Sequence, residues 1–142
     1  MKKILVAAIC LSLFAFIKFD PFDDFLKKIE TYVQEHPQEK AYLHLDKPYY
    51  AVGEDIWFKA YVTDTRSDKL STLSSVLYVE LIDAADSIKT QLKLPLVNGL
   101  SFGDFKLGDS IPEGNYRIRA YTQLMRNLGP DYFYDKACLR TS

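Results

Sequence analysis

The sequence predicts an all-β sandwich preceded by one amphipathic α-helix. Between residues 20 and 37, hydrophobic residues recur with the helical period of 3.6. After Pro37 the period changes to two, which is typical of half-buried strands. Turn residues then divide the chain into short segments, and no helical segment lies between these strands. This pattern argues against a parallel α/β fold, in which helices alternate with strands.

The first 18 residues are expected to be a targeting segment. Lys2 and Lys3 precede an uncharged run of 14 residues, 4–17, and Lys18 ends the run. The run is shorter than the ~20 residues that a helix needs to span a bilayer. We therefore interpret residues 1–18 as a secretory signal peptide. An uncleaved anchor is the alternative, because no clear small-residue cleavage site follows. Membrane contact is expected through this segment alone.

Residues 20–37 are expected to form the helix. Asp20 is a good N-cap, Pro21 suits the first helical position, and Pro37 ends the helix. The apolar residues form one stripe: Phe22, Phe25, Leu26, Ile29, Tyr32 and Val33. A short helix with one apolar face has to dock on something. We expect it to pack on its own domain, and the alternative is that it binds a partner.

Seven strands are expected in the rest of the chain. They are residues 41–45, 56–62, 76–82, 88–94, 100–107, 116–121 and 132–137. Turn signals such as Asn98-Gly99 separate them. Seven short strands with such turns predict a seven-stranded antiparallel sandwich of the immunoglobulin or fibronectin-III kind.

Composition excludes several classes of function. The net charge is −1 with no polybasic stretch, so nucleic acid is not an expected partner. Two Cys are present, Cys10 and Cys138, and removal of residues 1–18 leaves one, so no intrachain disulfide is expected.

The sequence offers no catalytic or metal-binding constellation. His36 and His44 are the two histidines, and they are not spaced as a metal-binding pair. No G-x-S-x-G, P-loop or G-x-G-x-x-G sequence is present. We therefore predict a non-enzyme with no catalytic residue, no cofactor and no metal.

A family resemblance covers residues 40–139. Its elements are Asp46-Lys47-Pro48, then Tyr50, Gly53 and Phe58-Lys59, then Asn98-Gly99 with Phe105, then Ile111-Pro-Glu-Gly-Asn-Tyr-Arg-Ile-Arg-Ala120. In order and spacing they resemble a macroglobulin MG2 domain. Residues 37–40, Pro-Gln-Glu-Lys, and 121–129 further resemble a region near the N-terminus of large exported envelope proteins of Bacteroidetes-type bacteria.

This resemblance implies a location and a partner. The location is the periplasm or the outer membrane, and the partner is an envelope protein or a neighbouring domain of a larger assembly. The chain would then be a truncated member of a larger multidomain family.

The shared motifs have structural explanations. Pro48 fixes a turn after the first strand, and Gly53 is expected to take a positive φ before the second. Gly114 and Tyr116 resemble a tyrosine corner, in which a Tyr hydroxyl bonds to upstream backbone. Asp46 and Lys47 complete the set of expected motif residues.

The aromatic residues, 14% of the chain, indicate an interaction surface. Trp57 and Tyr61 fall on the strand face opposite Ile56 and Phe58. We expect Tyr121 and Tyr132 to extend that exposed surface.

Three functional hypotheses follow. The first is a non-enzymatic structural or protein-interaction module of an exported envelope protein. The second is a component of a macroglobulin-type endopeptidase inhibitor, although the Cys-Gly-Glu-Gln thioester motif is absent. The third is a carbohydrate-binding module, which a row of exposed Trp and Tyr would favour.

Overall fold

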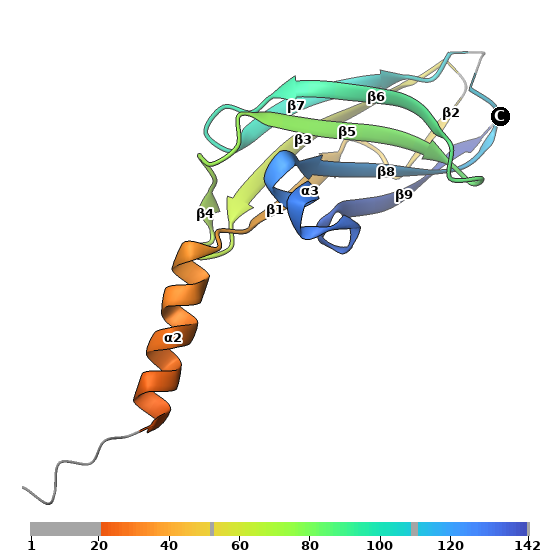
Figure 1. Ribbon diagram of the computed structural model, residues 1–142. Coiled ribbons are helices and arrows are strands. Elements are labelled where there is room, and N and C mark those ends of the chain that lie inside the picture. Colours follow the sequence, from red (N-terminus) through yellow and green to blue (C-terminus); the bar gives the residue numbers. More distant parts are fainter. Residues whose placement is uncertain (1–20, 52, 109–110, 142) are drawn as a thin grey trace, which may run out of the picture. The chain divides into compact units, whose positions relative to one another are not determined.

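The chain divides into two units, residues 1–36 and residues 37–142. A computed structural model describes residues 21–51, 53–108 and 111–141 (Figure 1). The expected signal peptide at residues 1–18 and the N-cap Asp20 lie outside the described residues. No helix in the part of the chain that the structure describes is long and apolar enough to cross a membrane.

The first unit contains the helix α2, Pro21–Glu35. Asp23 and Asp24 lie in its first turn, where the helix dipole favours negative charge. The six stripe residues are between 41% and 60% exposed, and no residue of α2 is buried. Whether this stripe packs on the chain's own sandwich or on a partner stays a prediction.

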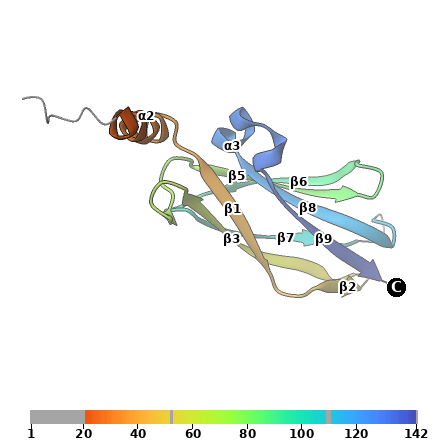
Figure 2. The ribbon, with the colours of Figure 1, turned by 90° about the horizontal axis from the view of Figure 1, so that it is seen from below.

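The second unit is a sandwich of two sheets (Figures 1 and 2). Sheet A contains β1 (Glu39–Leu45), β3 (Asp55–Asp64), β4 (Lys69–Leu70) and β7 (Leu100–Lys106). Sheet B has the order β2 (Tyr49–Ala51), β9 (Tyr134–Thr141), β8 (Gly114–Thr122), β5 (Val76–Asp83) and β6 (Ile88–Pro95). The β-sandwich prediction is confirmed. A helix α3 (Gln123–Leu128) and a 3-10 turn η1 (Pro130–Tyr132) join β8 to β9 and were not predicted.

The prediction of seven antiparallel strands is wrong in two respects. The two short strands β2 and β4 raise the described count to nine. In addition, β2 pairs with β9 in parallel, Tyr49 opposite Leu139. The reason is that the chain leaves sheet A after β1, crosses at residues 46–48 and joins the edge of sheet B with little change of direction. All other strand pairs in the described residues are antiparallel.

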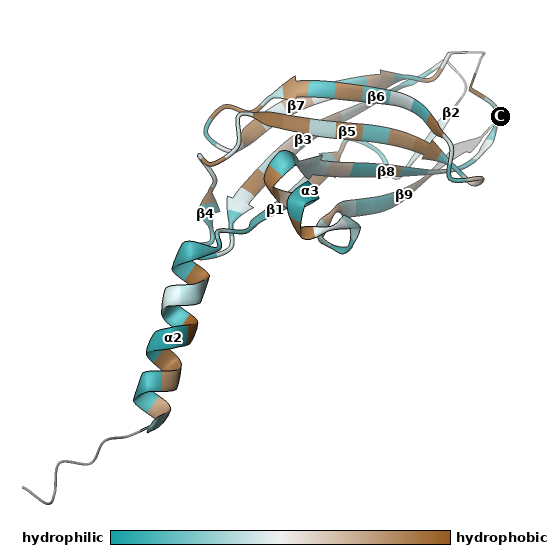
Figure 3. Ribbon diagram, viewed as in Figure 1, coloured by the Kyte–Doolittle hydropathy of each residue, from teal (hydrophilic) through white to brown (hydrophobic). Residues whose placement is uncertain are grey.

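The core lies between the sheets and follows the strand alternation. Along β1, every second side chain from Glu39 to Leu45 is buried and the others are exposed. Hydrophobic bands in β5 are interrupted by hydrophilic ones (Figure 3). Phe58 of β3 and Phe105 of β7 pack in the core with ring centroids 5.7 Å apart.

The turn Asn98-Gly99 leads into β7 and lies directly against β3. Asn98 has φ 49° and Gly99 has φ 74°, the conformation that a tight hairpin turn requires. The carbonyl of Gly99 accepts from the backbone N of Val62 at 2.7 Å. A Cβ on Gly99 would lie 2.6 Å from the Val62 carbonyl oxygen. Glycine is therefore required here both for its φ and for the space.

Candidate functional site

The motif Asp46-Lys47-Pro48 fixes the start of β3. A carboxylate oxygen of Asp46 accepts from the Tyr50 hydroxyl at 2.7 Å and from the backbone N of Trp57 at 3.2 Å. Tyr50 is buried, and this burial together with the bond to Asp46 raises the pKa of its hydroxyl. Lys47 pairs with Glu54 at 2.7 Å. The motif thus holds the chain at the crossing between sheets and sets the register at Trp57.

Gly53 completes this turn. Its φ is +80°, a conformation that favours glycine. Its backbone N donates to the carbonyl of Leu107 at 3.0 Å, and the backbone N of Leu107 donates to the carbonyl of Glu54 at 3.1 Å. The turn is therefore hydrogen-bonded to the residue after β7, next to the pair Asp55 and Lys106 at which the pairing of β3 with β7 ends.

Tyr116 lies at the start of β8 with its ring in the core. Its hydroxyl donates to the carbonyl of Pro112 at 2.6 Å, four residues upstream. Gly114 between them has φ +146°. This is the hydrogen bond that a tyrosine corner makes, and it closes the loop before β8.

The outward side of sheet A carries a cluster that we call the aromatic face: Tyr42 of β1, Trp57, Lys59 and Tyr61 of β3, and Phe102 and Asp104 of β7. The register places them in rows, with Tyr42 opposite Tyr61, Phe102 opposite Lys59 and Asp104 opposite Trp57. Phe102 is 81% exposed, Trp57 54% and Tyr42 53%. The strand alternation causes this exposure, because Ile56, Phe58 and Ala60 take the buried side of β3.

Contacts within the aromatic face hold part of it in place. The Lys59 ammonium lies 5.3 Å from the centroid of the Tyr61 ring. The Tyr42 ring is 6.5 Å from that of Tyr61 and meets Tyr134 edge-on at 5.7 Å. Lys59 and Asp104 form no ion pair with any described residue. Two opposite charges therefore stand among exposed rings, and neither is paired with an opposite charge among the described residues.

An apolar hollow of about 500 Å³ adjoins the aromatic face. Lys59 and Phe102 line it together with Pro95, Val97 and Leu100. Val97 is 66% exposed. The hollow extends the apolar surface from β3 and β7 to the turn before β7.

Tyr121 is not part of this surface, which corrects the sequence prediction. It is 7% exposed, with its ring stacked between Tyr78 at 5.4 Å and Phe133 at 4.4 Å. Its hydroxyl donates to the buried carboxylate of Glu80 at 2.8 Å. Burial and this bond raise the pKa of Tyr121 to about 12. Alternation placed Tyr121 on the outward side of sheet B, but the segment after β8 folds back and covers it.

Tyr132 lies in η1 and is 46% exposed. It lines a different hollow, of about 400 Å³, beside residues 38–41 at the start of β1. The structure therefore brings together Trp57 and Tyr61 of the four predicted surface residues, and it places Tyr121 and Tyr132 elsewhere. Phe102 and Tyr42, which sequence reasoning missed, complete the face.

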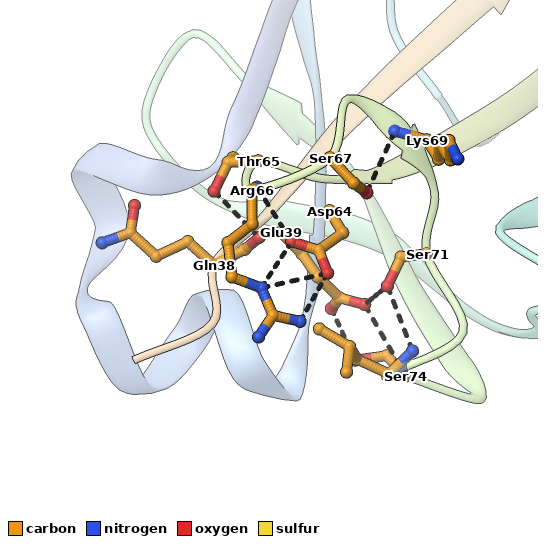
Figure 4. A network of polar contacts seen from close by, with 10 residues as sticks. Gln38, Glu39, Asp64, Thr65, Arg66, Ser67, Lys69, Ser71 and Ser74 are labelled. Carbon is orange, nitrogen blue, oxygen red and sulfur yellow. Dashed lines mark hydrogen bonds and ion pairs between the residues drawn. The ribbon is translucent and has the colours of Figure 1, made fainter. Parts of the chain in front are cut away.

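A buried carboxylate, also missed from the sequence, joins distant segments. Glu39 is 2% exposed and accepts from the hydroxyls of Ser71 at 2.5 Å, Ser74 at 2.6 Å and Thr122 at 2.6 Å. The backbone N of Ser74 adds a fourth bond at 3.2 Å. Figure 4 shows Ser71 and Ser74 directed at Glu39. Thr122 also accepts from the backbone N of Met125 and so caps α3.

This network joins two segments that are far apart in the sequence. Glu39 belongs to residues 37–40, and Thr122 belongs to residues 121–129. They lie 83 residues apart in sequence and are joined by a hydrogen bond. The network ties the entry to β1 to the helix after β8.

Side chains that could act as metal ligands or nucleophiles are few in the part of the chain that the structure covers. No group of three or more His, Cys, Asp or Glu that could hold a metal occurs among the described residues. His44 lies on the outward side of sheet A, opposite Lys59. Cys138 is buried, and burial raises the pKa of its thiol to about 11.

Solved structures show the same fold. The native E. coli alpha-2-macroglobulin matches 73% of this chain at 14% identity, with a TM-score of 0.59. Trypsin-activated E. coli alpha-2-macroglobulin matches 72% at 16% identity and 0.58, and Salmonella alpha-2-macroglobulin reacted with methylamine matches 73% at 14% identity and 0.59. This chain covers 6% of each of those chains. No family model and no curated protein matches the sequence. The second unit is a macroglobulin-like β-sandwich.

Proposed function

We propose that this chain is a non-enzymatic protein-binding module that acts through the aromatic face of sheet A. The observation that supports the proposal is the exposure of Phe102, Trp57 and Tyr42 on one side of one sheet. Exposed aromatic clusters of this kind mark binding surfaces, because their burial supplies much of the energy of an interface.

The two outward sheet faces differ in a way that supports this proposal. On sheet B, the rings of Tyr78, Tyr121 and Phe133 stack on one another. Lys93 lies over the Tyr78 ring and Arg119 over the Phe133 ring. These three rings thus cover one another, and Tyr49 of the edge strand β2 is the exposed aromatic residue of sheet B at 62%. On sheet A, by contrast, Phe102, Trp57 and Tyr42 are each more than half exposed on one side of the sheet.

The wider setting is part of the same proposal. The apolar run at residues 4–17 supports export, and the motif residues support an MG2-type domain of a Bacteroidetes-type envelope protein. A partner in the envelope, or a neighbouring domain, would then cover the aromatic face. The likeness to the alpha-2-macroglobulins supports a shared fold only. It does not support an inhibitor activity, since the chain covers 6% of their length.

Site-specific photo-cross-linking tests the proposal. A photoreactive phenylalanine analogue at Phe102 should give one defined protein adduct in the cells from which the chain comes. The control is the same group at Lys93, which is exposed on β6 of the other sheet. Adducts at both positions, or at neither, would refute a binding role for this face.

Carbohydrate binding is a second candidate, and the placement of Trp57 and Tyr61 favours it. They lie four residues apart on one strand, so their Cα atoms are about 13 Å apart along it, with Lys59 between them. Rings spaced along a flat face suit stacking on a sugar chain. Trp57 is the only tryptophan, so titration of its fluorescence with soluble glycans reports on this site. An unchanged spectrum with all glycans tested would exclude this candidate.

A further inference from the structure

We infer that the aromatic face binds a second copy of this chain and forms a two-fold symmetric dimer. The inference rests on the proposed function, because it names the occupant of the same binding surface. It follows from the pattern of rings and charges on β3 and β7.

Four side chains form a near-square on these two strands. Trp57 lies opposite Asp104, and Lys59 lies opposite Phe102. Neighbouring strands are about 4.8 Å apart, and residues two apart on a strand are separated by roughly 6.6 Å. The two rings therefore occupy one diagonal of the square, and the two opposite charges occupy the other.

This arrangement is complementary to itself. Consider a two-fold axis that lies in the interface along the Trp57–Phe102 diagonal. Rotation about this axis places Lys59 of one copy over Asp104 of the other, and the reverse. Lys59 of each copy then lies within roughly 3 Å, in projection, of Asp104 of the other copy, while each ring meets its own counterpart. The strands of the two copies cross at about 70°, close to the orthogonal class of sheet packing.

The exposed area suits such an interface. A buried aromatic side chain covers roughly 150–250 Å². With the exposed fractions of Phe102, Trp57 and Tyr42, the face offers roughly 300–450 Å² of aromatic surface in each copy. That is about half of the ~800 Å² per partner in a standard interface. Val97 and the hollow beside it add apolar area at the rim.

The charges of Lys59 and Asp104 also favour a second copy of the chain as the partner. Burial of Lys59 under an apolar partner would leave an unpaired charge, which is strongly unfavourable. A second copy supplies Asp104 to each Lys59, so both charges of each copy become paired on association.

Analytical ultracentrifugation of the full chain tests the inference through charge reversal. Wild type should form dimers, and Lys59→Asp and Asp104→Lys should each weaken dimerisation at least tenfold, because like charges then face each other. An equimolar mixture of the two variants should dimerise again, since both contacts become attractive in the mixed dimer. This recovery also shows that the variants are folded. Lys93→Asp on sheet B is the matched control and should dimerise as wild type does.

The outcomes are distinct. A wild-type chain that stays monomeric up to about 100 µM would overturn the inference, as would a mixture of variants that does not recover. A monomeric chain that still forms a defined adduct with another protein from position 102 would refute the dimer and leave the proposed function standing. A monomer without such an adduct would refute both.

Discussion

Replacement of Glu39 by Gln should destabilise the sandwich by about 2–3 kcal/mol. The glutamate is buried and accepts four hydrogen bonds, two on each carboxylate oxygen. Gln has the same shape but offers an NH₂ group in place of one oxygen. The hydroxyls of Ser74 and Thr122, which both donate to Oε2, would then face a donor. Two charge-assisted bonds are lost, and a buried donor without a partner costs about 1–3 kcal/mol.

Urea unfolding followed by circular dichroism measures this effect. The midpoint should fall while the slope stays the same, because the variant changes stability and not the surface exposed on unfolding. Glu113→Gln is the matched control, since Glu113 is exposed, and it should stay within about 0.5 kcal/mol of wild type. A Glu39→Gln variant as stable as this control would show that the network does not contribute to folding as argued.

Three further predictions concern the fold. Tyr116→Phe should cost about 1 kcal/mol in urea unfolding, because it removes the bond to the Pro112 carbonyl, whereas Tyr132→Phe, at an exposed position, should cost almost nothing. Equal effects would argue against the tyrosine corner. Gly99→Ala should lower the melting temperature more than Gly53→Ala: both have positive φ, but only at Gly99 would the new Cβ meet backbone atoms, at 2.6 and 2.8 Å. The reverse order would contradict the packing of that turn against β3. Because the pKa of Tyr121 is raised to about 12, the folded state holds this proton more tightly than the unfolded state does. Its contribution to stability is complete below pH ~10 and is lost as the pH rises towards 12, so Tyr121→Phe should flatten the fall in stability across that range. An unchanged slope would contradict the burial of the Tyr121 hydroxyl beside Glu80.

The main strands were predictable because each buries one face. Alternation along residues 56–62 identifies a strand and the side on which Trp57 and Tyr61 lie. The short strands β2 and β4 have three and two residues, too few to show a period. They exist because of the strands beside them, and that pairing is set by the fold.

The site was only partly predictable. Alternation within residues 100–107 does place Phe102 and Phe105 on different sides of the strand, so the exposure of Phe102 could have been inferred. Its position beside Lys59 depends on the pairing of β7 with β3, which no local pattern shows. Alternation likewise gives the side of the sheet on which Tyr121 lies, but not that Phe133 covers it.

Glu39 illustrates the same limit. Its place in the alternation of β1 is on the buried side, where a carboxylate is unexpected. The hydroxyls that make its burial favourable come from residues 32, 35 and 83 positions away. Only the three-dimensional structure brings these groups together.

The most direct test of the aromatic face as a binding surface is the accessibility of Trp57 to a neutral fluorescence quencher. Trp57 is the only tryptophan, so its emission reports on this face. In dilute protein, where the chain is monomeric, we expect clear quenching that is weaker than that of a free tryptophan, since Trp57 is 54% exposed. In the dimer, or in a complex isolated through position 102, we expect quenching to fall several-fold. Protection in the dilute monomer, or equal quenching in the free and bound states, would contradict the assignment of the aromatic face as the binding surface.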